Sequence, residues 1–170
     1  MKSTARVGAH PIHPMLIPYP FAFLSGAFGF RLAAKVRGDA TLGRTADHLR
    51  TVGVASALVA AVPGIMDYFG TVPSGRPKTT ATQHALSNSS ALVCFIAAAL
   101  AARKQDEAAV LRFETVGTAL LALGGWLGGS LSYHHHVGVV EDARGRQARM
   151  EAPRDELVRE QVEVIENVGP

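Results

Sequence analysis

Four long apolar runs without a Lys, Arg, Asp or Glu constrain this chain more than any other feature. A helix that crosses the ~30 Å hydrocarbon core of a bilayer needs about 17 to 25 residues, so each run is long enough once a turn is added at its ends. A soluble amphipathic helix would instead carry a charged stripe every three or four residues. We therefore predict an integral, multi-pass membrane protein whose spans are Met15 to Phe30, Thr51 to Met66, Ala85 to Ala102 and Thr115 to Tyr133.

The segments between these runs are short and polar, which limits the topology. They cover Lys35 to Leu49, Gly70 to Gln83 and Arg103 to Glu114, and short connections force antiparallel neighbours. The predicted fold class is all-α, an up-down-up-down four-helix bundle over residues 8–140. A polar C-terminal tail follows over residues 141–170, with a helix from Glu151 to Val168 and a partly ordered segment as alternatives.

Composition excludes several classes of function. The formal net charge is only +3 and the basic residues are spread over several loops, so nucleic acid is not an expected partner. Cys94 is the single cysteine, which excludes a Cys-rich metal or iron–sulfur site. The sequence also lacks Gly-x-Ser-x-Gly, His-Glu-x-x-His and P-loop motifs. A stand-alone enzyme is therefore less expected than a subunit or accessory protein.

Ionisable side chains gather at one predicted end of the bundle. Antiparallel spans place six of the seven histidines and Asp67 at the same membrane face, with His48 at the other. In the string His10-Pro-Ile-His13-Pro, each proline holds the preceding histidine in extended geometry, so two imidazoles precede the first span on a stiff segment. An ionisable group near membrane depth is costly, and its default interpretation is a functional site.

Further residues of the predicted spans bear on such a site. His84 and Asn88 are four residues apart and share a helix face. The Asp67 carboxylate is suited to accept a ring N–H and so fix a histidine tautomer. The last span carries glycines at small-xxx-small spacing, which brings helices close together or makes room for a flat ligand. The alternative for His84 and Asp67 is a set of interfacial hydrogen bonds that join two helix ends.

The order of these motifs resembles a bacterial membrane-protein family, domain of unknown function 2231. The resemblance covers about Gly8 to Val140 and rests on His10-Pro-Ile-His13-Pro, Gly64-Ile-Met-Asp67, His84-x-x-x-Asn88 and the glycine-rich segment that ends at Tyr133. It implies a four-span bacterial protein without assigned activity, here placed in the inner membrane. Some members are joined to a Rieske-type iron–sulfur domain, which suggests a Rieske-type or other redox protein as partner.

Two functions remain open. The first is an electron-transfer module that binds haem b or a transition metal ion. We expect His84 as a ligand, with His13 or His135 as the second, and His10 joining them if a bare metal ion is bound. Asp67 and Asn88 would support the ligands, and Gly125 and Gly129 would make room for the macrocycle. The second is an accessory or structural membrane protein without cofactor, in contact with lipid and open to homo-oligomer formation. A proton-coupled carrier is least favoured, because four spans offer no charged pathway.

Overall fold

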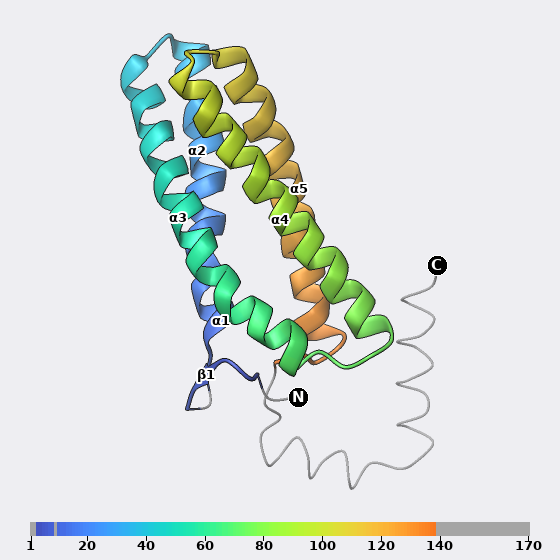
Figure 1. Cartoon of the computed structure of the whole chain (residues 1–170). Helices are drawn as coiled ribbons and strands as arrows, with labels where there is room; N and C mark the ends of the chain where they lie inside the picture. Colours follow the sequence, from blue (N-terminus) through green and yellow to red (C-terminus); the bar gives the residue numbers. More distant parts are fainter. Residues whose placement is uncertain (1–2, 9, 139–170) are drawn as a thin grey trace, which may run out of the picture.

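The computed structural model describes residues 3–8 and 10–138 and has four long helices (Figure 1). A short antiparallel pair of strands opens the chain, with β1 at Arg6–Val7 and β2 at His10–Pro11. The single turn α1 follows directly and leads into the first long helix. The helices are α1 at Ile12–Leu16, α2 at Pro18–Arg37, α3 at Ala40–Gly70, α4 at Arg76–Arg103 and α5 at Glu107–Tyr133.

The helices extend beyond the apolar runs and absorb most of the predicted connections. Only Gly38 and Asp39 separate α2 from α3. Gly38 ends α2 with a φ of 66°, a left-handed conformation that suits glycine. The Asp39 side chain caps α3 by accepting from the backbone N–H of Thr41, and Asp106 caps α5 by accepting from Ala109. The tail over residues 141–170 lies outside the described residues, and so does its predicted helix.

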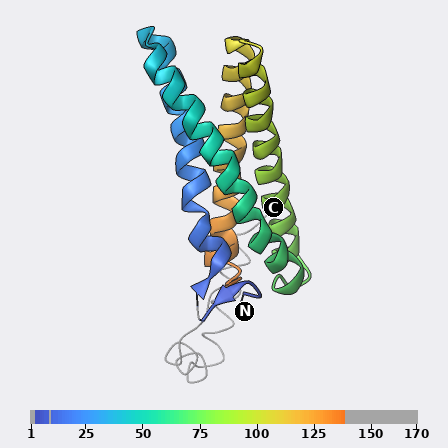
Figure 2. The same cartoon turned by 60° about the vertical axis from the view of Figure 1, so that its left-hand side comes forward.

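Two antiparallel hairpins make up the bundle. The first hairpin comprises α1, α2 and α3, and the second comprises α4 and α5; helices pack more extensively within a hairpin than between hairpins (Figure 2). The turns between α2 and α3 and between α4 and α5 lie at the upper end in Figure 1. The N-terminal segment, the α3–α4 connection and the end of α5 lie at the lower end.

Glycines on the helices let large side chains approach a neighbouring backbone closely. A Cβ atom added to Gly53 of α3 would lie 2.6 Å from Cδ2 of Leu24, and one added to Gly117 of α5 would lie 2.9 Å from Cε2 of Phe95. Leu24 and Phe95 are both fully buried and belong to the apolar core cluster halfway along the bundle. The small residues of the spans therefore act as packing devices.

The outer surface of the helices is apolar, as lipid contact requires. Large side chains such as Leu58, Val93 and Trp126 are more than half exposed, an arrangement that would be costly in water over so wide an area. Each of the four segments Ile12–Arg37, Ala40–Gly70, Arg76–Arg103 and Glu107–Tyr133 is long and apolar enough to cross a membrane. The predicted all-α membrane bundle with four spans is confirmed.

Candidate functional site

His13 lies in α1 and is held by the neighbouring helix α3. Its Nδ1 atom lies 2.8 Å from the carbonyl oxygen of Ala60. Because a carbonyl only accepts, Nδ1 donates this hydrogen bond and carries a proton. The ring packs over Gly64, where an added Cβ would lie 2.7 Å from Cε1 of His13. Helix α3 thus fixes both the place and the tautomer of this imidazole.

His84 in α4 repeats this arrangement against α5. Its Nδ1 atom lies 2.8 Å from the carbonyl oxygen of Gly124, and its ring packs over Gly128, where a Cβ would lie 2.9 Å from Cε1. The side chain of Asn88 donates to the carbonyl oxygen of His84 at 2.9 Å, and its amide nitrogen lies 3.3 and 3.4 Å from the two ring nitrogens. Asn88 thus contacts His84, as their spacing predicts.

The two imidazoles meet across the boundary between the hairpins. Their ring centroids are 6.3 Å apart and the ring planes are perpendicular. Each ring donates its Nδ1–H to a carbonyl of its own hairpin, so these two hydrogen bonds do not join the hairpins. Ala60 lies ten residues before the end of α3 at Gly70, which corresponds to about 15 Å along a helix. The pair therefore lies inside the helical span, deeper than the apolar run that begins at Met15 indicates.

Asp67 contacts a different part of the chain from the one its motif suggested. Its carboxylate accepts from Ser3 Oγ at 2.7 and 2.8 Å, from the backbone N–H groups of Thr4 and Ala5 at 2.8 and 3.1 Å, and from Thr71 Oγ1 at 3.1 Å. It thereby binds the N-terminal segment. Backbone carbonyls, rather than the Asp67 carboxylate, accept the ring N–H groups of His13 and His84. Carboxylates and carbonyls both serve this purpose for metal-bound histidines.

Two further histidines of the predicted ligand set lie apart from the pair of His13 and His84. His10 is exposed on β2, in register with Val7. His135 lies beyond α5, and its Nε2 atom is 3.4 Å from Oγ1 of Thr80. Burial lowers the pKa of His135, and the neighbouring His134 lowers it further. Within residues 3–8 and 10–138, no three His, Cys, Asp or Glu side chains lie close enough to hold a metal ion.

Helix α5 carries two glycine pairs at four-residue spacing, and the pair that contacts the polar residues is Gly124 with Gly128, whereas the predicted room for a ligand lay at Gly125 and Gly129. Gly124 lies against Asn88 and Gly128 lies against His84. Gly125 lies against Phe21, whose Cε2 would be 3.3 Å from an added Cβ, and the nearest such neighbour of Gly129 is Tyr133 of the same helix at 4.0 Å. Room for a macrocycle beside Gly125 and Gly129 stays a prediction.

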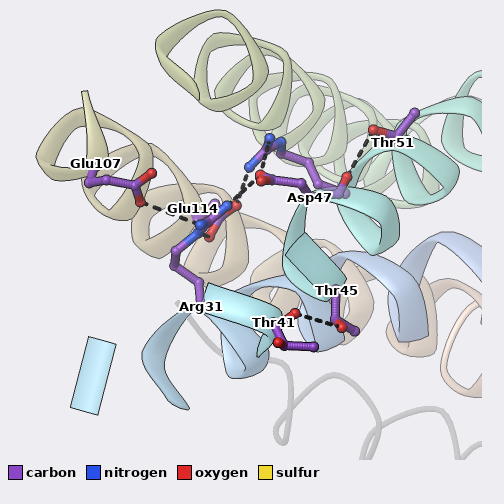
Figure 3. A network of polar contacts seen from close by, with 8 residues as sticks. Arg31, Thr41, Thr45, Asp47, Thr51, Glu107 and Glu114 are labelled. Atoms are coloured by element: carbon purple, nitrogen blue, oxygen red, sulfur yellow. Dashed lines mark hydrogen bonds and ion pairs between the residues drawn. The ribbon is translucent and has the colours of Figure 1, made fainter. Parts of the chain in front are cut away.

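A buried network of charges joins the hairpins at the upper end (Figure 3). Arg50 Nη1 of α3 binds Glu114 Oε1 of α5 at 2.8 Å, and Arg31 Nε of α2 lies 3.6 Å from Glu114 Oε2. Asp47 accepts from both arginines at 2.5 and 2.6 Å. The exposed Glu107 lies 3.4 Å from Arg31. Arg31, Arg50 and Glu114 are all at least 95% buried, so the network neutralises charges inside the bundle.

The apolar runs put these charges directly beside span ends, because Arg31 follows Phe30 and Arg50 and Glu114 precede the second and fourth runs, but the runs do not predict their pairing. The available signal was their sign and position, because the antiparallel topology brings the end of the first span, the start of the second and the start of the fourth to the same end. Arg31 and Arg50 carry positive charge there and Glu114 carries negative charge. Opposite charges at one depth on neighbouring helices are expected to pair, since an isolated charge near a membrane is costly.

Comparison with known proteins supports the resemblance of the motifs. The family model described as "Predicted membrane protein (DUF2231)" matches residues 9–141, most of the chain and all four spans. No curated protein and no solved structure matches the chain significantly. The match includes His13, His84, Asn88 and the charge network of the upper end. The chain therefore belongs to the DUF2231 family of predicted membrane proteins.

Proposed function

We propose that this protein is a membrane electron-transfer module that binds haem b through His13 and His84. The observation that carries the proposal is the pair of tautomer-fixed imidazoles whose ring centroids are 6.3 Å apart. Both rings donate their Nδ1–H groups to backbone carbonyls, and a histidine that binds a metal ion through Nε2 commonly donates its other ring N–H in this way. His13 and His84 would therefore be the two residues that hold a haem iron.

The number of ligands favours haem over a bare metal ion. A structural or catalytic zinc site uses three or four protein ligands, whereas among the described residues no third His, Cys, Asp or Glu joins His13 and His84. A haem iron needs at most two protein ligands because the macrocycle supplies the others. When bound, the haem would supply one-electron redox chemistry. The protein would orient the two Nε2 atoms, exclude water from the bundle interior and hold the Nδ1 protons on the carbonyl oxygens of Ala60 and Gly124.

The setting of this module is also part of the proposal. A Rieske-type or other redox protein would exchange electrons with it, as suggested by the Rieske domains joined to similar chains. The bacterial inner membrane would be its location, which follows from the bacterial family that the chain resembles. Such a protein would be an electron-transfer subunit rather than a stand-alone enzyme.

Haem binding is tested on detergent-purified protein from cells with ample haem. We expect one haem per chain, a Soret band and a reduced α band in the wild type, and loss of the pigment in His84→Ala and His13→Ala. The matched control is His48→Ala, because His48 is an exposed histidine on the upper half of α3. Colourless wild-type protein would refute haem binding and leave the accessory role without cofactor. Metal analysis on the same sample tests for a transition metal ion.

A further inference from the structure

The Asp67 carboxylate at the lower end accepts several hydrogen bonds, none of them from the rings of His13 and His84. Oδ1 accepts from the backbone N–H groups of Thr4 and Ala5 and from the hydroxyls of Ser3 and Thr71, and Oδ2 accepts from Ser3. Ser3, Ala5 and Thr71 are each more than 90% buried. One carboxylate thus ties down three consecutive residues of the N-terminal segment.

This tie extends along the chain to His13. The carbonyl oxygen of Ala5 accepts from the backbone N–H of Ile12 at 2.9 Å, and the β1–β2 pairing closes the loop between them. Ile12 directly precedes His13 and begins α1. The backbone from which His13 extends is therefore held by hydrogen bonds that lead back to Asp67.

The His13 ring and the N-terminal segment that precedes it both contact the same face of α3. Ala60, Gly64 and Asp67 of α3 are spaced by four and three residues, which aligns them on one side of the helix, and Thr71 caps its C-terminal end four residues later. Ala60 accepts from the His13 ring, Gly64 provides space for that ring, and Asp67 and Thr71 hold the segment that precedes it. A single helix face thus fixes His13 through its side chain and through its backbone.

We infer that Asp67 is a positioning residue for His13, acting through the N-terminal segment rather than by contact with the imidazole. The role of His13 as a haem ligand rests on the proposed function, whereas the positioning itself does not. His84 is a built-in control, because α5 holds it through Gly124 and Gly128 and Asp67 has no part in that arrangement.

The test compares Asp67→Ala and Asp67→Asn with the wild type, first in protein without haem. Nitrogen-15 shifts of the ring nitrogens report the tautomer of each histidine. We expect Nδ1–H forms for both His13 and His84 in the wild type, a mixture of tautomers for His13 in Asp67→Ala, and no change for His84. Asp67→Asn keeps one acceptor oxygen and should restore part of the His13 signal. Asp39→Ala, which removes a helix cap at the opposite end, should change neither ring.

Haem titration of the same variants gives the second readout. Loss of a group that orients a metal-bound histidine typically lowers affinity by about 10- to 100-fold, and we expect this range for Asp67→Ala. Ser3→Ala, which removes one partner and leaves Asp67 in place, supplies a milder variant if Asp67→Ala does not fold. An unchanged His13 tautomer in Asp67→Ala, or equal changes at His13 and His84, would overturn the inference. Wild-type protein that binds no haem would refute the proposed function alone, because the tautomer of His13 still tests the positioning.

Discussion

The two ends of the bundle both carry buried polar groups, yet they use them in opposite ways. At the upper end, Arg31 and Arg50 of the first hairpin lie 3.6 and 2.8 Å from the carboxylate of Glu114 in the second, so opposite charges pair across the boundary. At the lower end, His13 and His84 each bond to a carbonyl of their own hairpin and face each other at 6.3 Å. The upper end pairs its buried charges across the two hairpins, whereas the lower end brings together two imidazoles that do not bond to one another.

This contrast explains why we assign function to the lower end. Removing one member of the buried charge network would leave its partners buried without their counter-charge, which is strongly destabilising. Imidazoles that are fixed in tautomer and close in space, without bonding to one another, have the features of ligands for a common centre. The separation of roles predicts that stability and ligand binding respond to different residues.

The largest effect on stability is expected from Glu114→Gln. The substitution leaves Arg31 and Arg50 buried without their shared carboxylate, and breaking a buried ion pair costs about 3–5 kcal/mol. The measurement is the free energy of unfolding in mixed detergent micelles, with haem content determined on the same samples. Glu107→Gln is the matched control, because the exposed carboxylate of Glu107 contributes at most about 1 kcal/mol. Equal stability of the Glu114 variant and the wild type would refute this role of the charge network.

A smaller effect on stability, with a large effect on ligand binding, is expected from Gly128→Ala. The new methyl group would lie 2.9 Å from Cε1 of His84 and must displace the ring, at a cost of roughly 1–3 kcal/mol. Haem affinity should fall with it, as measured by titration. Gly129→Ala adds the same methyl group one residue further, where its nearest such neighbour is Tyr133 at 4.0 Å. Equal haem affinity in the two variants would contradict the claim that Gly128 provides the space for the His84 ring.

The smallest effect is expected from Asp106→Ala at the upper end. Its side chain accepts from the backbone N–H of Ala109 and caps α5, and loss of such a cap costs about 1 kcal/mol. Thermal unfolding measures the loss, and Lys104→Ala in the same exposed turn serves as the control. The haem spectrum should be identical in both. A changed spectrum would mean that the two ends of the bundle are coupled, against the separation of roles.

Much of the fold was predictable because it depends on one-dimensional patterns. Uncharged runs of membrane length and short polar connections suffice to predict four antiparallel spans. The helix ends were harder to predict, because α3 continues through the charged residues Asp47 and Arg50, whose partners on other helices are Arg31 and Glu114. That pairing is a property of the assembled bundle and not of the local sequence.

The candidate site was predictable in its residues but less so in its contacts. Spacing alone aligned His84 with Asn88, and topology placed His13 at the same end. The partners of Asp67 were not predictable, because they include the backbone N–H groups of Thr4 and Ala5. Nearly every residue has such a group, so the sequence does not mark which ones bind the carboxylate. Whether Gly124 and Gly128 or Gly125 and Gly129 face α4 depends on the rotation of α5 about its axis. Both pairs have the same four-residue spacing, so the sequence does not determine which pair contacts His84 and Asn88.

Ligation of the iron by both imidazoles is tested most directly by X-ray absorption and electron paramagnetic resonance of the haem-loaded ferric protein. We expect two axial imidazole nitrogens and a low-spin signal in the wild type, and loss of one axial nitrogen in each of His13→Ala and His84→Ala. The upper-end variant Glu114→Gln should keep both nitrogens. A wild-type iron with one imidazole or none, or a spectrum unchanged by either histidine substitution, would contradict the assignment of the lower end as the ligand site.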